Sequence, residues 1–250
     1  MEPLRILHLY PRELGINGDV GNVTTLVARA AWRGIPAVVH EHQVGEAIPE
    51  HVDLVHIGSG PLSAQHAVHE DVARIASRLV SLAASGVPFL AIAGGWQLLG
   101  RELVTAQGDR LAGAGVFPSR AILGAARTVG EVVLKTSDGI VTGFENHSAA
   151  TVLEEGALPF GVVVSGGGNT PDVAGERFEG IRVGESVGTQ LHGSLLPMNP
   201  VVADRLLLAA LRRRDSGAVL TAAPELARVD EFAARSREAI IARCGARVSL

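Results

Sequence analysis

The sequence is poor in several residue types that support particular functions. Its 250 residues include a single cysteine, Cys244, so neither an internal disulfide nor a thiolate metal cluster can form, and a reducing cytoplasm is the simplest expectation. Aromatic residues make up only 4% of the chain, which leaves few rings on which single-stranded nucleic acid could stack. The net charge of −4 gives no basic excess for nucleic-acid binding.

Long apolar runs and cofactor motifs are also missing. No apolar stretch approaches the roughly 18 residues of a membrane-spanning helix, and the acidic and proline residues of MEPLRILHLYPREL are not typical of a signal peptide. Gly166-Gly167-Gly168 lacks the lysine and hydroxyl residue of a phosphate-binding loop. No group of His, Asp and Glu has metal-ligand spacing. We therefore expect no metal, no cofactor, no nucleic-acid partner and no membrane span.

The residues that are abundant indicate an α/β protein. Hydrophobic residues make up 47% of the chain, as in sheets that are covered on both faces. Strands are expected at 4–9, 35–40, 54–57 and 89–93, and helices at 23–33, 70–85 and from Trp96. This alternation predicts parallel strands joined by right-handed crossovers. Later segments predict strand pieces with short turns at 120–134, 140–144, 151–168 and 180–188, and helices at 199–212 and 228–243.

The domain organisation follows from the same pass along the chain. Neither an internal repeat nor a low-complexity linker interrupts it, so we expect a single domain over 1–250. Its core covers about 4–212, and a helical extension covers about 216–250. Glycine-rich loops follow at least three of the expected strands, at the edge of the sheet where open α/β folds bind ligands.

The stretch FLAIAGGWQLLG, residues 89–100, has the pattern of a buried strand, a sharp glycine turn and a helix. Turns of this kind often present a catalytic nucleophile, yet the residue at the apex, Ala93, has no nucleophilic atom. Further motifs accompany it in a fixed order. They are Gly18–Asn22 (GDVGN), Trp32–Gly34, Gly58-Ser59-Gly60, Arg127–Glu131, Gly143–His147 and Gly188–Pro200 (GTQLHGSLLPMNP).

In these motifs and their order the chain resembles class I glutamine amidotransferases of the cobyric-acid-synthase type. More narrowly, it is similar to the glutaminase subunit of bacterial lipid II isoglutaminyl synthase. The resemblance covers nearly the whole chain. It implies a three-layer, flavodoxin-like fold with a largely parallel sheet flanked by helices. It also implies L-glutamine as substrate, and an ATP-dependent, Mur-ligase-like partner subunit that would use the ammonia to amidate the D-glutamate of a peptidoglycan precursor.

The same resemblance implies roles for particular residues. Ala93 occupies the position of the family's nucleophilic cysteine, and His192 that of its catalytic histidine. Arg127 would hold the α-carboxylate of glutamine. Gly58 and Gly60 would contribute to the oxyanion pocket, and Gly94 and Gln97 of the elbow complete the substrate-binding set. His192 is followed by Gly193 and Ser194, so the His-x-Glu pattern of triad enzymes is absent and no third catalytic residue can be named.

Each of these roles has a purely structural alternative. A lone histidine is more often a structural residue at the end of a strand, Arg127 could be a solvated surface arginine, and the glycines could serve a turn alone. The chain departs from the family pattern at Pro61–Ala64, which counts against normal substrate handling or partner contact. Together with Trp96 in place of tyrosine, this departure favours a natural divergent branch slightly.

The alanine at position 93 leaves the activity open. The substitution is either engineered, or natural in a non-catalytic relative, or compensated by another residue. The last is disfavoured because no Cys or Ser adjoins the elbow. As written, the chain is expected to be inactive. Two classes of function remain: a glutaminase subunit without its nucleophile, and a pseudo-amidase scaffold or regulatory subunit. A cobyric-acid-type amidotransferase is the enzymatic alternative.

Overall fold

The computed structural model describes residues 2–170, 175–246 and 248. A six-stranded sheet forms its centre, in the order β11-β12-β4-β3-β1-β2. Its strands are β1 (Leu4–Leu9), β2 (Ala37–His42), β3 (Leu54–Ile57), β4 (Phe89–Ile92), β11 (Ile181–Val183) and β12 (Ser186–Thr189). All neighbouring strands are parallel except β11, which pairs antiparallel with β12. The largely parallel sheet predicted from the sequence is thus confirmed.

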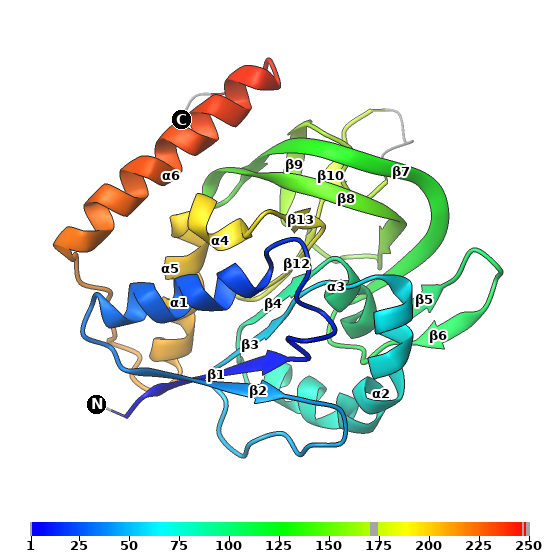
Figure 1. Ribbon diagram of the computed structural model, residues 1–250, viewed down its shortest axis with the longest axis horizontal. Helices are drawn as coiled ribbons and strands as arrows, with labels where there is room; N and C mark the ends of the chain where they lie inside the picture. Colours follow the sequence, from blue (N-terminus) through cyan, green and yellow to red (C-terminus); the bar gives the residue numbers. More distant parts are fainter. Residues whose placement is uncertain (1, 171–174, 247, 249–250) are drawn as a thin grey trace.

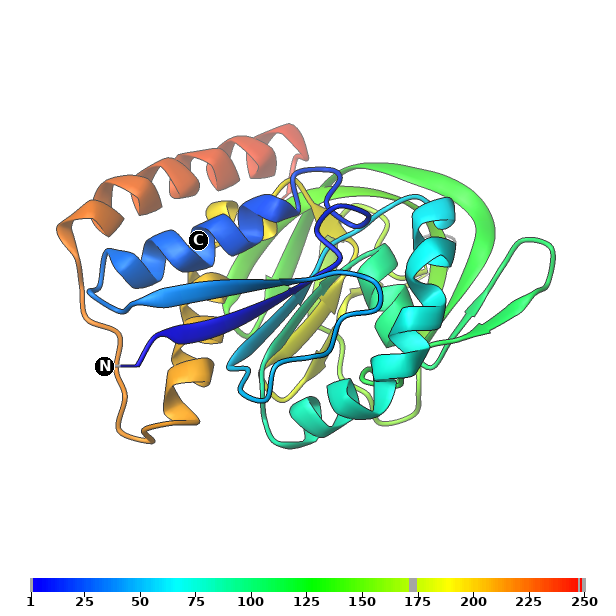
Figure 2. The same ribbon diagram turned by 60° about the horizontal axis from the view of Figure 1, so that its bottom comes forward.

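Helices cover both faces of this sheet. The helices are α1 (Val20–Ala31), α2 (Leu62–Ala84), α3 (Gly94–Leu99), α4 (Leu195–Met198) and α5 (Pro200–Arg212). One apolar core contains residues of α1 and α5, the other residues of α2 and α3. Figure 2 shows α1 and α2 on opposite sides of the strands. Because successive strand residues point to opposite faces, β1 contributes Leu4 and Ile6 to one core and Leu7 and Leu9 to the other. The three-layer prediction is confirmed.

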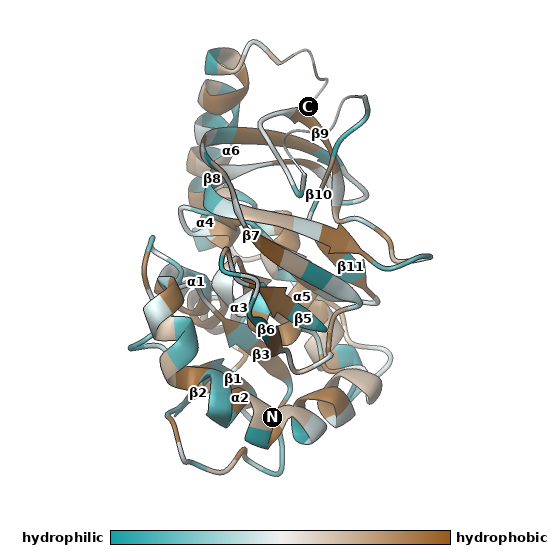
Figure 3. Ribbon diagram, turned by 90° about the vertical axis from the view of Figure 1, so that its right-hand side faces the viewer, coloured by the Kyte–Doolittle hydropathy of each residue, from teal (hydrophilic) through white to brown (hydrophobic). Residues whose placement is uncertain are grey.

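A second sheet, which the sequence did not predict as such, lies beside the first (Figures 1 and 3). It is built on a long hairpin of β7 (Ser119–Thr136) and β8 (Gly139–Leu153). The smaller strands are β5 (Glu102–Val104), β6 (Arg110–Ala112), β9 (Gly161–Ser165), β10 (Phe178–Glu179) and β13 (Leu191–His192). The expected strand at 120–134 is confirmed as part of β7, where an irregularity between Leu123 and Thr128 shifts the register without ending the strand. The expected end of the next strand at 144 was wrong, because β8 continues to Leu153.

Several helices begin earlier than the hydrophobic pattern predicted. Helix α1 begins at Val20 rather than Val23, and α2 begins at Leu62 rather than Glu70, directly after Pro61. The last helix, α6 (Pro224–Arg243), begins with a proline at its first position, where the missing N–H group costs nothing. These first turns mix polar with apolar residues, so an apolar repeat does not mark where each helix starts.

Helix α6 lies outside the two cores of the central sheet and packs against α4 and the β7–β8 hairpin (Figure 1). Two ion pairs anchor it. The buried Arg29 of α1 reaches Asp230 at 2.6 Å, and Arg243 pairs with Glu131 of β7. Within the described part of the chain, no helix combines the length and apolarity needed to cross a bilayer.

Candidate active site

The elbow between β4 and α3 forces an unusual backbone on Ala93. This residue has φ 41° and ψ −105°, a conformation that glycine dominates because a Cβ is crowded there. Two hydrogen bonds hold it in place. The Ala93 N–H donates to the Thr189 carbonyl at 2.7 Å, and the Ala93 carbonyl accepts from the Gln97 N–H at 2.9 Å. The elbow therefore fixes residue 93 at the carboxyl edge of the parallel sheet.

The glycine turn after β3 packs directly on the elbow. A Cβ built on Gly95 would stand 2.4 Å from the Gly58 carbonyl oxygen, and one on Gly94 would stand 3.2 Å from the Gly60 carbonyl oxygen. Only glycine permits this approach of two backbones. The first N–H groups of α3 have no partner within the helix, and the Gly94 N–H makes no hydrogen bond with another described residue. Such an N–H group has the chemistry that an oxyanion requires, and the role of Gly94 stays a prediction.

Gln97 follows one turn later on α3. Its side chain is buried, and its amide oxygen finds no hydrogen-bond partner among the described residues. A buried amide without a partner is unusual, because losing its hydrogen bonds with water costs free energy. The position of Gln97 beside the elbow fits the substrate-binding role that the sequence predicted, and that role stays a prediction.

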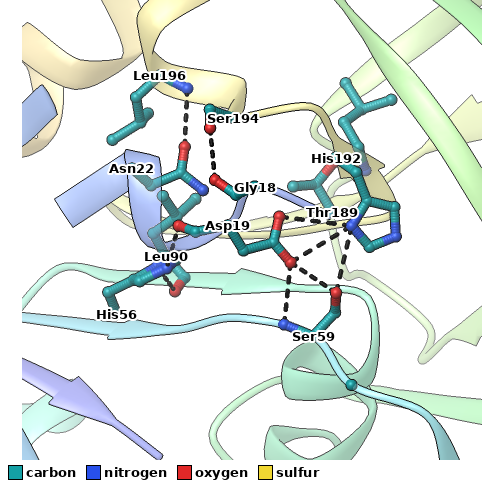
Figure 4. Close-up of polar contacts among 12 residues, drawn as sticks. Gly18, Asp19, Asn22, His56, Ser59, Leu90, Thr189, His192, Ser194 and Leu196 are labelled. Atoms are coloured by element: carbon teal, nitrogen blue, oxygen red, sulfur yellow. Dashed lines mark hydrogen bonds and ion pairs between the residues drawn. The ribbon is translucent and has the colours of Figure 1, made fainter. Parts of the chain in front are cut away.

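His192 lies in β13 and meets an acidic residue from the opposite end of the chain (Figure 4). Its Nδ1 is 3.4 Å from both carboxylate oxygens of Asp19 and 3.3 Å from the Ser59 hydroxyl. Asp19 is itself fixed, since the Ser59 hydroxyl and N–H donate to its Oδ2 at 2.6 and 3.0 Å. Both His192 and Asp19 are buried.

This arrangement selects one tautomer of His192. Nδ1 faces only acceptor oxygens, so it carries the proton, and the Nε2 lone pair makes no hydrogen bond within the described residues. Ser59 stands between the two glycines that touch the elbow, which places His192 and residue 93 at the same turn. A histidine held in this way can act as a general base.

Two buried titratable residues support the site: His56 contacts Asp19, and Glu179 contacts Thr189, which binds the Ala93 N–H. His56 lies with its Nε2 3.2 Å from the Asp19 carbonyl oxygen and its Nδ1 3.1 Å from the Leu90 carbonyl oxygen. Burial lowers the pKa of His56, so the ring is neutral and donates to only one of these two carbonyl groups. Glu179 accepts hydrogen bonds from the Gln190 N–H and the Thr189 hydroxyl, at 2.6 and 2.9 Å. Burial, reinforced by the nearby Glu145 carboxylate, raises the pKa of Glu179 to about 8 despite these hydrogen bonds.

Arg127 lies on β7 of the second sheet, within the register irregularity between Leu123 and Thr128. Phe144 of β8 pairs with His192, and Asn146 follows two residues later on the same strand. The side chains of His192, Phe144 and Asn146 therefore share a face of this sheet. The Arg127 Nε donates to the Asn146 amide oxygen at 3.0 Å. Its terminal nitrogens make no hydrogen bond with a described residue, which leaves the guanidinium available for a carboxylate.

The structure thus gathers Ala93, Gly58, Gly60, Gly94 and Gln97 at one elbow, with His192 at the adjoining turn. Asp19 is the functional candidate that sequence reasoning missed. The signal was present in the GDVGN motif, but nothing in the sequence places residue 19 beside a residue 173 positions away. Among the described residues, no group of three or more His, Cys, Asp and Glu side chains could hold a metal ion.

Comparisons with known proteins agree with this geometry. Residues 5–200 match the model of the CobB/CobQ-like glutamine amidotransferase domain. The chain is 33% identical over 216 residues to the lipid II isoglutaminyl synthase (glutamine-hydrolyzing) subunit GatD of Staphylococcus aureus, covering 86% of this chain and 87% of that one. The corresponding subunit of Streptococcus pneumoniae is 31% identical over 215 residues, with 84% and 82% covered.

Solved structures show the same fold. A crystal structure of a glutamine amidotransferase superposes with a TM-score of 0.57 at 17% identity, covering 82% of this chain and 98% of that one. The matched family domain includes both the elbow and His192. The chain therefore belongs to the CobB/CobQ-like glutamine amidotransferases and is homologous to the glutaminase subunit of lipid II isoglutaminyl synthase.

Proposed function

We propose that this chain is the glutamine-binding subunit of a lipid II isoglutaminyl synthase. Its site is built to release ammonia from L-glutamine for the amidation of the D-glutamate of a peptidoglycan precursor. The observation that carries the proposal is the buried Asp19–His192 pair at the turn that packs on a strained nucleophile elbow. The 33% identity to a glutamine-hydrolysing subunit over most of both chains supports it.

The chemistry requires a thiol at position 93. Nε2 of His192 would take the thiol proton, and the sulfur would attack the side-chain carbonyl carbon of glutamine to give a tetrahedral oxyanion near the Gly94 N–H. The imidazolium would then return the proton to the leaving nitrogen as ammonia departs, leaving a thioester. A water molecule, deprotonated by His192, would release glutamate and the free thiol.

With alanine at position 93, the reaction cannot proceed beyond the binding of glutamine. With no nucleophile the thioester cannot form, and the chain as given is expected to hold glutamine without hydrolysing it. The Arg127 guanidinium would hold the α-carboxylate, while Asn146 keeps the arginine side chain in place. The proposed partner is an ATP-dependent, Mur-ligase-like subunit that receives the ammonia, and the proposed location is the cytoplasm, where glutamine and the precursor are present.

The test is the Ala93→Cys chain. Glutamate release from glutamine is measured with and without the synthetase subunit, alongside the parent chain and the Ala93→Cys/His192→Ala double variant. Because a missing nucleophile costs on the order of 10⁶-fold in rate, the single variant should exceed both controls by at least about 10³-fold. A folded Ala93→Cys chain that releases no glutamate, even with its partner, refutes the glutaminase proposal.

A second function is favoured by Ala93 itself: a non-catalytic glutamine-binding or scaffold subunit. Pro61–Ala64 and Trp96 also depart from the family pattern, which is more than a single engineered change requires. The sequence of the natural gene distinguishes the two cases, since a cysteine codon at position 93 shows an engineered substitution. Calorimetric titration of the parent chain with glutamine then shows whether the site still binds its ligand.

A further inference from the structure

The loop that carries Asp19 is fastened to the segment that carries His192 by three further contacts. The Gly193 N–H donates to the Asn17 carbonyl at 3.3 Å, the Ser194 hydroxyl donates to the Gly18 carbonyl, and the Leu196 N–H donates to the Asn22 side-chain oxygen at 2.9 Å (Figure 4 shows the last two). We call these three contacts, between 17–22 and 193–196, the loop clasp. In the sequence its partners lie on both sides of Asp19 and directly after His192.

Ser194 is an unexpected residue at its position. Its backbone has φ 52° and ψ 88°, in the left-handed region that glycine adopts freely and that costs other residues about 1 kcal/mol or more. A glycine would avoid this cost but would also remove the hydroxyl that binds Gly18. The Ser194 side chain therefore supplies a contact that a glycine, which suits this backbone better, would lack.

The opposite side of the clasp leaves room for that hydroxyl. A Cβ built on Gly21 would stand 2.3 Å from the Ser194 Oγ and 3.1 Å from its Cβ. Any side chain at Gly21 would push the hydroxyl away from the Gly18 carbonyl. Glycine at 21 and serine at 194 are thus complementary parts of one contact, although they lie far apart in the sequence.

The contact between Asp19 and His192 depends on where the loop sits. At 3.4 Å from each carboxylate oxygen, Nδ1 is already at the long end of hydrogen-bonding distance. Small shifts of the loop would break this contact and release the imidazole from its tautomer. The Ser194–Gly18 hydrogen bond joins the residue directly before Asp19 to a residue two positions after His192, and it is the one contact of the loop clasp that a serine hydroxyl makes, so it can be removed without touching the backbone.

We propose that Ser194 is a positioning residue, whose hydroxyl holds the Asp19 loop against His192 and so keeps the imidazole oriented for proton transfer. The proposal rests on the proposed glutaminase function. Ser194 acts through Asp19 and touches neither the substrate nor the reacting atoms. Its loss should lower kcat about 10- to 100-fold, the range that a displacement of about 1 Å produces, while KM changes little.

The activity test uses the Ala93→Cys chain and its synthetase partner. Ser194→Ala, Ser194→Gly and Gly21→Ala should each lower kcat, and Ser194→Gly should be the more stable of the two serine variants because it relieves the left-handed backbone. Ser194→Ala added to Asp19→Asn should lower kcat no further, since both act through one contact. Ser236→Ala, which removes a serine-to-carbonyl hydrogen bond on α6, is the matched control and should leave kcat unchanged.

A second readout needs no catalysis and uses the parent chain with Ala93. The Nδ1 proton of His192 is followed by NMR. Its signal should be visible in the parent chain, absent in Asp19→Asn, and broadened by water exchange in Ser194→Ala. This readout separates failure of the present proposal from failure of the glutaminase proposal, which would show as an inactive Ala93→Cys chain with the NMR pattern intact.

Three results would overturn the positioning role. One is full kcat in Ser194→Ala. Another is an equal loss from Ser194→Ala with and without Asp19→Asn, which indicates a structural role. The third is an Nδ1 proton signal that Ser194→Ala leaves as sharp as in the parent chain.

Discussion

Replacing Ala93 with glycine tests whether the elbow stores backbone strain. In most buried positions this change destabilises a protein, because glycine gains freedom in the unfolded chain and leaves a methyl-sized gap. Ala93 differs because its φ of 41° and ψ of −105° lie in a region that glycine occupies without a Cβ clash. The matched control is Ala91→Gly, two residues earlier in β4, which is also buried but has no positive φ.

The magnitudes can be worked out from these positions. The greater freedom of glycine in the unfolded chain lowers the free energy of unfolding by roughly 0.4–1 kcal/mol at either site. The loss of one buried methyl group lowers it by about 0.8 kcal/mol more. At Ala93 alone, relief of strain returns about 1–3 kcal/mol. Ala91→Gly should therefore lower the free energy of unfolding by about 1.5 kcal/mol, while Ala93→Gly leaves it nearly unchanged.

Urea unfolding of the parent chain and both variants measures this difference. The two variants should differ by about 1.5 kcal/mol, or roughly 3–6 °C in Tm for a chain of this length. If Ala93→Gly loses as much stability as Ala91→Gly, the elbow carries no strain. The reasoning that links its conformation to a presented nucleophile would then be wrong.

Three other changes probe the surroundings of the site. Glu179→Gln should abolish the fall in stability that this carboxyl causes as pH rises. The pKa of Glu179 is raised from 4.5 to about 8, so the carboxyl stabilises the fold fully below about pH 4.5 and this stabilisation is lost as pH rises through 8. The free energy of unfolding at pH 5 and pH 8 measures the change, and a pH dependence equal to the parent's refutes the prediction. Gly188→Ala should cost about 1–3 kcal/mol and change tryptophan fluorescence, since its Cβ would stand 2.5 Å from the Trp96 ring; parental values for both would contradict the packing. Burial raises the pKa of Asp71, but hydrogen bonds from His42 and three other donors outweigh burial and lower this pKa to about 2. Asp71→Asn should therefore flatten the loss of stability as pH falls from about 4 toward 2. Acid unfolding identical to the parent's would count against this prediction.

The site could be predicted from the sequence only in part. The elbow is a local feature, since Phe89–Ile92, Ala93 and Gly94 are contiguous and their apolar and glycine residues dictate a strand, a sharp turn and a helix. Placing His192 relied on a resemblance in motif order. Asp19 was not assigned a role, because a single acidic residue in a glycine-rich loop looks like turn chemistry.

The sequence by itself determined the elements that depend on neighbouring residues. The alternating strands and helices of the first hundred residues, the elbow at Ala93 and the proline start of α5 all follow from local periodicity and backbone preference. Only the tertiary structure decided which distant segments meet. The pairing of β12 with β4, the Asp19–His192 pair and the Ser194–Gly18 contact join residues that lie far apart in the sequence, and no local pattern encodes them, because hydrophobic periodicity reveals that a face is buried but not what it is buried against.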